Sequence, residues 1–590
     1  MKTQKKPKNI WKTIIRICGY TKDMKLLMTI MLVLCIIGAI GRTIGNLYLQ
    51  QIIDNYITPL TNNYTNELFA SFVNIILIVL GLFIIGAIAT LIVWQISAFV
   101  SNEMLEGKLK PDLFKKMESL PLNYFDTNKN GDIMSLYTND MRSISGLLYT
   151  GFITLITSTT ITIINFSMML YLSWQLTIII VLTLFVMIIK TKQFAKGSKL
   201  YFKKQQIETG KLNGFVEEMV QGQKVVKVFN REKQSKIDFD HINNKLCDSS
   251  TKANSYVNLL MPTLNNVSNI NYAIIIIVGS TLVFKDILTL GVAVAFFQFS
   301  KAFIYPISEL TQIFKEIMSA LAGAERIFAV FDLKEEINGG TREVKELKGN
   351  VELKNVVFKY NNEKIILNNI NLKVDAGTKI ALVGSTGAGK TTITSLLNRF
   401  YDVSEGSILF DGIDIREFKL KSLRKNISVV LQDTHLFTGT VMENIKYGRR
   451  KATDEEAIMA SKLANADDFI QHLPEKYNTI LTGDATNLSQ GERQLLNITR
   501  ALLVKTPLLI LDEATSSIDT RTEKLIEEGM NNLMKGKTTF IIAHRLSTVR
   551  NSNIIVVLEH GKIIEHGNHQ ELLDRKGRYY QLYTGMSELE

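Results

Sequence analysis

The sequence is poor in cysteine, and its three cysteines form no pattern. Cys18, Cys35 and Cys247 are scattered without the spacing of metal ligands, so neither a disulfide framework nor a zinc site is indicated. The start of the chain also lacks a small-residue cleavage site after a short apolar core, which argues against a secretory signal peptide. Residues 1–25 instead interleave lysine and arginine with isoleucine and tryptophan, a pattern typical of a basic amphipathic segment on the inner face of a membrane.

Charge is missing or sparse over long stretches of the amino-terminal half. At roughly 20 residues per crossing, these stretches predict six membrane-spanning helices. They comprise Leu26 to Gln50, Leu68 to Asn102, two crossings within Ser143 to Ile189 joined by a turn near Ser173 to Gln175, Ala253 to Phe284, and Gly291 to Phe314. Three ionisable residues fall inside the predicted spans, namely Arg42, Lys301 and Glu309. They either mark a substrate path or serve as structural or snorkelling charges.

Lysine and arginine are absent from Thr43 to Gly107, whereas the connections 103–142 and 190–252 are rich in lysine. This asymmetry predicts that both termini are cytoplasmic in a multi-pass protein of the cell membrane, embedded in the lipid bilayer. The net charge of +12 is therefore a topology signal, and no nucleic-acid partner is expected. Both connections have helical periodicity, each with a break, at 120–132 and 226–235, so we expect helices that reach a soluble domain.

A change in composition separates this half from the carboxy-terminal half. The expected organisation is a cytoplasmic amphipathic segment (1–25), an all-α six-helix transmembrane domain with two long intracellular loops (26–320), a linker (321–350) and an α/β P-loop nucleotide-binding domain (351–590). The chain is thus predicted to be a multidomain membrane protein.

The stretch Val383 to Thr392, VGSTGAGKTT, matches the phosphate-binding template G-x-x-x-x-G-K-[ST] between an apolar strand and a periodic helix. Glycines allow backbone N–H groups to turn toward phosphate oxygens, Lys390 reaches the terminal phosphates, and the Thr391 hydroxyl ligates Mg²⁺. ATP and Mg²⁺ are therefore the expected cofactors. The loop residues that we expect to bind them are Gly384, Ser385, Thr386, Gly387, Ala388, Gly389, Lys390, Thr391 and Thr392.

Two acids follow a second apolar run. Asp512 ends the strand LLILD and is placed to hold Mg²⁺ through water. Glu513 follows directly and is placed to polarise the attacking water. Together with the glycine loop, this pair predicts ATP hydrolysis.

Between these motifs lies NLSQGERQ, Asn487 to Gln494, which resembles the LSGGQ signature of ABC transporters. The resemblance covers essentially the whole chain and is closest to bacterial half-size exporters of the type IV fold. It implies an adenine-stacking role for Tyr360, a contact of Gln432 with Mg²⁺ and the membrane domain, and a switch role for His544. It also implies a D-loop at Ser516 to Asp519. Two such chains would sandwich ATP, each glycine loop facing the partner's Ser489, Gln490, Gly491 and Glu492.

This chain departs from the family pattern at Gln490, which replaces glycine, and at Glu492, which replaces glutamine. The stretch just before the signature, LTGDATN (Leu481 to Asn487), also differs from the VGERG that the family has there. An extra acid near the partner's γ-phosphate is unfavourable by like-charge repulsion. The resemblance therefore favours one half of a heterodimer that contributes the competent base Glu513 with His544 and a weakened signature. A homodimer remains open.

The resemblance implies ATP-driven, multidrug-type export of small amphipathic or lipophilic compounds by alternating access. A lipid or peptide exporter of the same architecture is the nearest alternative. From another class, the chain could be an ATP-gated channel or a non-pumping regulatory subunit, against which intact Glu513 and His544 count. The polar residues Asn46, Gln50, Asn165, Asn265, Gln298 and Gln312 are either cavity-lining or packing residues.

Overall fold

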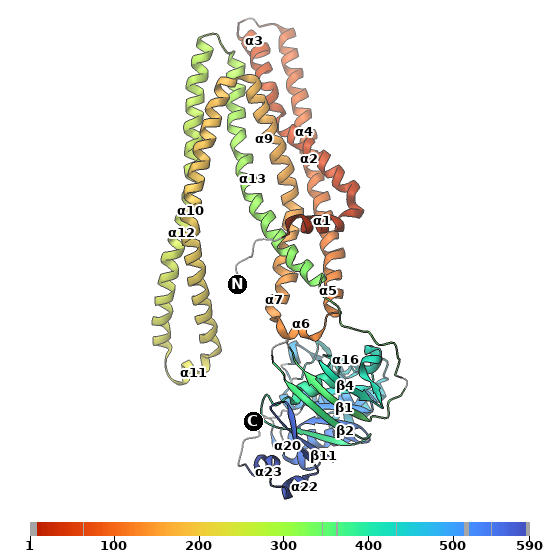
Figure 1. Ribbon diagram of the computed structural model, residues 1–590. Helices are drawn as coiled ribbons and strands as arrows, with labels where there is room; N and C mark the ends of the chain where they lie inside the picture. The colour runs from red at the N-terminus through yellow and green to blue at the C-terminus, as the bar shows by residue number, and fades with distance from the viewer. Residues whose placement is uncertain are drawn as a thin grey trace. The chain divides into compact units, whose positions relative to one another are not determined.

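The computed structural model describes residues 9–62, 64–344, 346–360, 364–431, 434–485, 487–512, 519–543 and 546–585 (Figure 1). Contacts divide the chain into two compact units. The first comprises Met1–Ser119 and Lys129–Lys334, and the second comprises Leu120–Asn128 and Glu335–Glu590. The short segment 120–128, which lies within the helical half in sequence, therefore belongs with the carboxy-terminal unit.

The described part of the first unit consists of helices and the short segments that join them. Its helices are α1 (Ile10–Tyr20), α2 (Lys25–Ile52), α3 (Thr58–Asn62), α4 (Asn66–Asn102), α5 (Lys110–Glu118), α7 (Asn130–Ser135), α8 (Met141–Gly146), α9 (Phe152–Leu172), α10 (Trp174–Gln221), α11 (Gln223–Val228), α12 (Glu232–Phe284) and α13 (Leu290–Phe331). π-helical segments at 53–57, 103–109, 136–140 and 147–151 connect neighbouring helices without interrupting them.

Six of the resulting continuous helices in the described part of the chain are long and apolar enough to cross a membrane. This count agrees with the prediction from uncharged stretches. The turn predicted near Ser173 is confirmed, because α9 ends at Leu172 and α10 begins at Trp174. The Ser173 hydroxyl accepts a hydrogen bond from the Leu176 amide at 3.4 Å and so caps α10.

Helices α2 and α4 approach each other at a pair of glycines. A Cβ placed on Gly41 would lie 2.6 Å from the Cα of Gly86, a separation that no side chain tolerates. Small residues of this kind allow the backbones of membrane helices to pack closely where no hydrophobic effect drives them together. This contact holds the first two spans side by side.

Helices α9 and α13 are joined by two polar contacts on either side of a proline. Pro306 lies inside α13 and has no N–H to give to the carbonyl of Ala302, one turn earlier. The amide of Asn165 on α9, which is completely buried, donates to that carbonyl at 3.1 Å. Ser158, also on α9, donates to the Glu309 carboxylate at 2.6 Å. Both bonds satisfy polar groups in an apolar bundle.

These contacts assign structural roles to two of the residues that the sequence left open. Asn165 is a packing residue that compensates for Pro306, and Glu309 joins two helices. Arg42 on α2 and Lys301 on α13 have exposed side chains within the first unit, so their roles stay open.

Helix α13 continues to Phe331, into the stretch expected to be a linker. Near its end, Arg326 forms a two-pronged ion pair with Asp140 of the π-helical segment 136–140. The Asp140 side chain is 4% exposed and that of Arg326 is 43% exposed. A bidentate pair of this kind adds geometric specificity, so it fixes this part of α13 against the segment 136–140.

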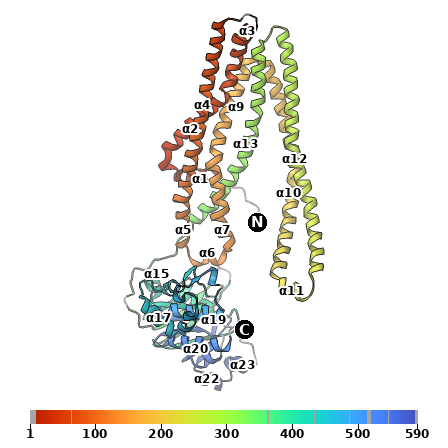
Figure 2. The same ribbon diagram turned by 180° about the vertical axis from the view of Figure 1, so that it is seen from behind.

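Helices α10 and α12 form a long antiparallel pair with the short α11 at its tip (Figures 1 and 2). The break predicted at 226–235 contains the end of α11 and the start of α12. The other predicted break, at 120–132, contains α6 (Leu122–Thr127) of the second unit.

The second unit is built on two principal sheets. Its strands are β1 (Val351–Phe358), β2 (Leu367–Val374), β3 (Lys379–Val383), β4 (Glu405–Phe410), β5 (Ile413–Asp414), β6 (Ile427–Val430), β7 (Gly439–Thr440), β8 (Ile480–Leu481), β9 (Leu508–Asp512), β10 (Thr538–Ile542), β11 (Ile554–Glu559) and β12 (Lys562–Gly567). One sheet is antiparallel with the order β2-β1-β4-β5. The other has the order β12-β11-β3-β10-β9-β6, and its neighbours pair in parallel except at β12.

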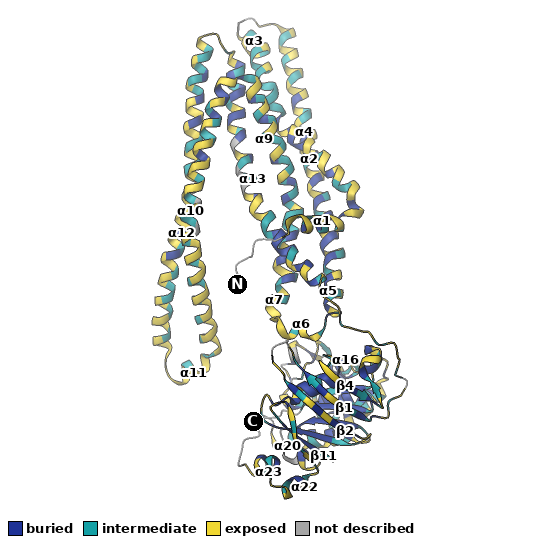
Figure 3. Ribbon diagram, viewed as in Figure 1, coloured by how far each residue is buried: buried dark blue, intermediate teal, exposed yellow. Residues whose placement is uncertain are grey.

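Helices accompany these strands. They are α14 (Lys390–Leu397), α15 (Leu420–Arg424), α16 (Val441–Lys446), α17 (Asp454–Leu463), α18 (Asp467–His472), α19 (Gln490–Leu503), α20 (Thr520–Met534), α21 (Leu546–Arg550), α22 (His569–Asp574) and α23 (Arg578–Tyr583). The central strands β3, β9 and β10 are almost wholly buried, and buried residues gather among the strands of this unit (Figure 3). Burial on both faces is typical of parallel sheets, and it explains why these strands read as continuous apolar runs.

Candidate nucleotide-binding site

The glycine loop lies between the end of β3 and the start of α14, as the sequence predicts. Gly384 and Gly389 have φ angles of 154° and 107°, a region that L side chains rarely adopt. A Cβ on Gly384 would lie 2.2 Å from the carbonyl oxygen of Leu558. Glycine is therefore required at position 384. The loop can turn its backbone N–H groups toward a phosphate at the start of α14.

Lys390 is the buried cation of this loop, with 8% of the residue exposed. Its ammonium donates to the carbonyls of Gly384 and Ser385, the latter at 3.2 Å. Burial lowers the pKa of Lys390, and the nearby charge of Asp512 acts in the opposite direction. The structure therefore places Lys390, the predicted phosphate ligand, close enough to Asp512 of β9, the predicted Mg²⁺ ligand, for their charges to interact.

Tyr360 lies at the same place. Its hydroxyl is 3.2 Å from the Thr392 hydroxyl on α14, and its ring packs edge-on against Phe358 and Tyr401 at centroid distances of 4.8 and 5.0 Å. The residue remains 41% exposed, so part of the ring is accessible to a flat partner. An aromatic ring next to a phosphate loop suits stacking on a nucleobase.

A second aromatic residue, which sequence reasoning missed, connects this site to α6. The Tyr401 hydroxyl donates to the Asp126 carboxylate of α6. Burial, together with this hydrogen bond and the charge of Asp126, raises the pKa of Tyr401. Asp126 therefore lies one aromatic ring away from Tyr360. No motif marks Tyr401 in the sequence, because its role depends on a contact between segments that are far apart in the chain.

The signature residues are arranged as the start of a helix. Ser489 precedes α19, and its hydroxyl oxygen accepts from the Glu492 amide at 3.3 Å. In return, the Glu492 carboxylate accepts from the Ser489 amide and from the Ser489 hydroxyl, each at 2.8 Å. This is a capping box. Gln490 is exposed and Gly491 is buried in the first turn.

The capping box changes the interpretation of Glu492. Comparison with the family motif marks this residue only as an unfavourable acid, although the spacing S-x-x-E is itself a signal for a capping box. Glutamate and glutamine both fit the third helical position, so this departure from the family pattern preserves the helix start. The Glu492 carboxylate also accepts a hydrogen bond from the Ser489 hydroxyl.

Asp519 similarly begins a helix. Its carboxylate accepts from the amides of Arg521 and Thr522 at 3.1 and 3.0 Å and caps α20. The bond from Thr522 is the main cause that lowers the pKa of Asp519. The ligand role expected for Asp519 stays a prediction beside this local one.

Gln432, Glu513 and His544 lie outside the described residues, as do residues 516–518 of the D-loop. Among the described candidates, the loop 384–392, Tyr360 and Asp512 come together around the ends of β3 and β9. Ser489 and Asp519 are each positioned by the helix that they cap. Thr391, the predicted Mg²⁺ ligand, is exposed at the start of α14.

The site and the helices together define a P-loop ATP-binding protein that carries its own membrane domain. The family model for the ABC transporter transmembrane region matches residues 28–307, and the model described as ABC transporter matches residues 367–516. The chain belongs to the ABC transporter family. In this family, ATP binding and hydrolysis are coupled to transport.

Several relatives are similar over most of the chain. The uncharacterized ABC transporter ATP-binding protein YfiC of Bacillus subtilis is 38% identical over 100% of this chain and 96% of its own length. The fatty acid ABC transporter ATP-binding/permease protein of Mycobacterium bovis is 38% identical over 84% of this chain and 79% of its own. The ATP-dependent lipid A-core flippase of Haemophilus influenzae is 36% identical over 86% and 87%, respectively.

Proposed function

We propose that this chain is one half of an exporter that uses ATP to move amphipathic or lipophilic compounds across the cell membrane, with both termini in the cytoplasm. The observation that carries the proposal is the buried Lys390, close enough to Asp512 for their charges to interact, in a chain whose described residues also form six candidate membrane spans. Multidrug-type efflux is the simplest form of this function.

Within the site, Lys390 and the loop amides would bind the phosphates, and Tyr360 would stack on the adenine. Thr391, Asp512 and Gln432 would hold Mg²⁺, which neutralises phosphate charge when bound. Glu513 would orient the attacking water, with His544 beside the γ-phosphate. Ser489, Gln490, Gly491 and Glu492 would face the nucleotide of a second half-transporter, with Asp519 near that interface.

Coupling to the membrane helices would run through α6. Because Asp126 binds Tyr401, and Tyr401 packs against Tyr360, a shift of the nucleotide-contacting ring would reach α6 through one intervening side chain. ATP would favour the closed dimer by its higher affinity for that state, and hydrolysis would remove this bias. This cycle constitutes alternating access.

A heterodimer is favoured over a homodimer by the hydrogen bond between Ser489 and Glu492. A hydroxyl has one proton to donate, and here it points to a carboxylate at 2.8 Å. To donate to the partner's γ-phosphate, Ser489 would have to give up that bond while the negative charge of Glu492 remained nearby. This chain would then supply Glu513 to one site and a weakened signature to the other.

Lipid export is the second candidate, because two relatives are named for a fatty acid and for lipid A-core. Both names denote lipophilic or amphipathic molecules, which agrees with the broader proposal. A peptide exporter, an ATP-gated channel and a regulatory subunit have no comparable support.

ATPase activity of the purified chain, alone and co-expressed with a second half-transporter, tests the assembly. We expect little turnover alone and strong turnover with the partner, abolished by Glu513→Gln while ATP binding is retained. Robust turnover alone that Glu513→Gln removes would refute the heterodimer.

Accumulation of a lipophilic dye in inverted vesicles tests export itself. We expect ATP-dependent uptake against the gradient of the dye. Movement only down the gradient would indicate a channel instead.

A further inference from the structure

Helix α10 carries six lysines in a short stretch directly after its uncharged part. They lie between Lys190 and Lys204, and no aspartate or glutamate occurs among them. The number of lysines and arginines in a connection influences the orientation of a membrane helix, whichever side of the helix they occupy. The arrangement of these lysines around α10 therefore carries information beyond topology.

Four of these lysines share one face of α10 and are called the lysine stripe below. They are Lys192, Lys196, Lys199 and Lys203. Their spacing, i, i+4, i+7, i+11, repeats on one side of an α-helix. The side chains of Lys192, Lys196 and Lys203 are exposed, so the stripe presents positive charge at the surface of the first unit.

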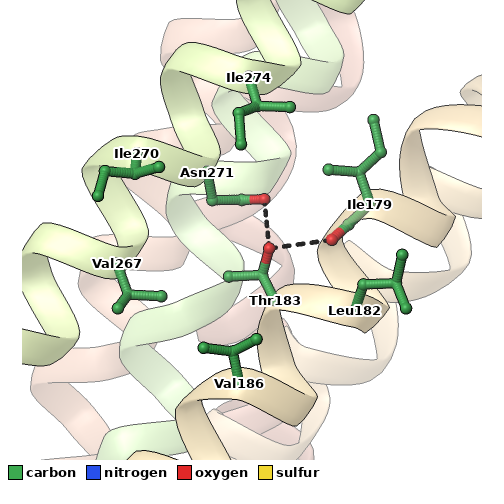
Figure 4. A pocket seen from close by; sticks show the side chains of 8 residues that line it. All are labelled: Ile179, Leu182, Thr183, Val186, Val267, Ile270, Asn271 and Ile274. Carbon is green, nitrogen blue, oxygen red and sulfur yellow. Dashed lines mark hydrogen bonds between the residues drawn. The ribbon is translucent and has the colours of Figure 1, made fainter.

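The opposite face of α10 packs on α12. Figure 4 shows Thr183 of α10 directed toward Asn271 of α12, and the Thr183 hydroxyl donates to the Asn271 side-chain oxygen at 2.7 Å. Further along both helices, the ring of Tyr201 stacks on that of Tyr256 with 5.4 Å between the centroids. The lysine stripe lies about half a turn around α10 from these contacts, so α12 does not cover it.

Two lysines of the stripe lie at a distance from Trp174 that matches the thickness of a bilayer. At 1.5 Å per residue, Lys192 and Lys196 are about 27 and 33 Å along α10 from Trp174, and the hydrocarbon core of a bilayer is about 30 Å thick. Trp174 is 62% exposed, and an aromatic residue at the start of the span suits the other membrane surface. Between these ends, Phe185 and Ile189 are exposed on the face of the stripe. When α10 crosses a bilayer, Lys192 and Lys196 therefore lie at the level of the lipid headgroups.

The charge of the lysine stripe is not balanced within the α10–α12 pair. The stretch of α12 that faces this part of α10 contains Tyr256, and no aspartate or glutamate occurs from Ser249 to Phe284. Lys252 adds a further positive charge. Among the described residues, none forms an ion pair with an exposed lysine of the stripe. The stripe therefore attracts an anion that the two helices do not supply.

From these observations we propose that the lysine stripe binds the headgroup phosphate of an anionic phospholipid. Lys192 and Lys196 are one turn apart, about 6 Å along the axis, so both ammonium groups can reach one phosphate while the acyl chains lie along Phe185 and Ile189. A basic segment next to a membrane helix gains affinity for anionic lipid with each lysine. The contact requires neither ATP nor a transported compound and holds for either orientation of the spans, so it does not rest on the proposed function.

Native mass spectrometry of the full-length protein in detergent resolves individual bound lipids and tests the proposal. The protein is titrated with phosphatidylglycerol, which is anionic, and separately with phosphatidylcholine of the same acyl chains, which is zwitterionic. We expect phosphatidylglycerol to bind about 25-fold more tightly, which corresponds to roughly fivefold for each of the two lysines. Equal dissociation constants for the two lipids would overturn the proposal.

Two double variants locate the preference for anionic lipid. Lys192→Gln/Lys196→Gln should remove it, because both ammonium groups at the headgroup level are lost. Lys190→Gln/Lys204→Gln is the matched control, since it removes the same number of lysines from the same stretch of α10 but leaves the stripe intact. The control should keep the wild-type preference to within about threefold, because charges more than about 10 Å away are largely screened by salt. An equal loss in both variants would indicate a general effect of net charge and would contradict the role of the stripe.

The same spectra distinguish two other occupants of this surface. If the stripe contacted a second copy of the chain, Lys192→Gln/Lys196→Gln would lower the fraction of dimer and leave lipid binding unchanged. If it bound free anions, inorganic phosphate would displace phosphatidylglycerol at a similar concentration. Either result would overturn the assignment to a lipid headgroup. Because neither ATP turnover nor transport is measured, failure here is independent of the exporter proposal.

Discussion

Replacing Glu492 with glutamine separates the two effects of its carboxylate. The variant keeps an acceptor at the third position of α19, so the capping box with Ser489 persists. It removes the negative charge and weakens the bond that engages the Ser489 hydroxyl. If that bond limits the contribution of Ser489 to ATP hydrolysis, ATPase activity should rise while the fold is retained.

The hydrogen bond sets the size of this effect. A bond to a charged acceptor contributes about 1.5 kcal/mol at the low end, which suits this half-exposed site, against about 0.5 kcal/mol for a weak neutral one. The difference of about 1 kcal/mol corresponds to roughly fivefold in rate. Loss of the charge at the start of the helix costs about 0.3–1 kcal/mol in stability, so the thermal midpoint should fall by no more than about 4 °C.

The assay is ATP turnover of the chain purified alone, with thermal unfolding measured on the same preparation. Glu492→Gln should raise turnover about fivefold, whereas Glu492→Ala, which also breaks the capping box, should lose about 1 kcal/mol more stability. Unchanged or reduced turnover in Glu492→Gln, with its thermal midpoint preserved, would refute the reasoning.

Three further variants test other contacts, each in the full-length protein. Tyr401→Phe removes the bond to Asp126 and should lower substrate stimulation of ATPase activity up to about fivefold while ATP affinity stays within about twofold; the reverse pattern would contradict coupling through this contact. Arg326→Met leaves the buried Asp140 carboxylate unpaired and should cost about 2 kcal/mol, seen as a lower thermal midpoint; a shift under about 1 °C would count against it. Burial lowers the pKa of Lys537 to about 8, so below pH 8 the buried charge of Lys537 destabilises the folded state. This destabilisation disappears as the pH rises from 8 toward the ordinary pKa of a lysine. Lys537→Met should therefore raise the thermal midpoint at pH 7 by about 4–8 °C, with the gain shrinking above pH 8; a gain independent of pH would exclude this cause.

The parts predicted correctly from sequence are those encoded locally. Uncharged runs gave the number of candidate spans, and the polar break at Ser173 gave a turn. The glycine loop followed from the strand Lys379–Val383 and the helix that begins at Lys390. In each case neighbouring residues alone determine the backbone conformation.

Contacts between distant segments could not be predicted in this way. The bond of Tyr401 to Asp126 and that of Asn165 to Ala302 each join elements far apart in sequence. The capping box at Ser489 differs, because its signal, the spacing S-x-x-E, is local and present in the sequence, whereas the family motif marks Glu492 only as an unfavourable acid. The expected roles of Gln432, Glu513 and His544 stay predictions.

The bond from Asn165 to Ala302 has a consequence for how α13 can bend. A proline inside a helix leaves the carbonyl four residues earlier without its intrahelical partner. The helix can therefore usually bend at this position. Here that carbonyl is held by a side chain of α9. If α13 pivots at Pro306, Asn165 must travel with it or leave the carbonyl bare in an apolar bundle. The two helices are therefore tethered at this point, so that bending of α13 at Pro306 also displaces α9.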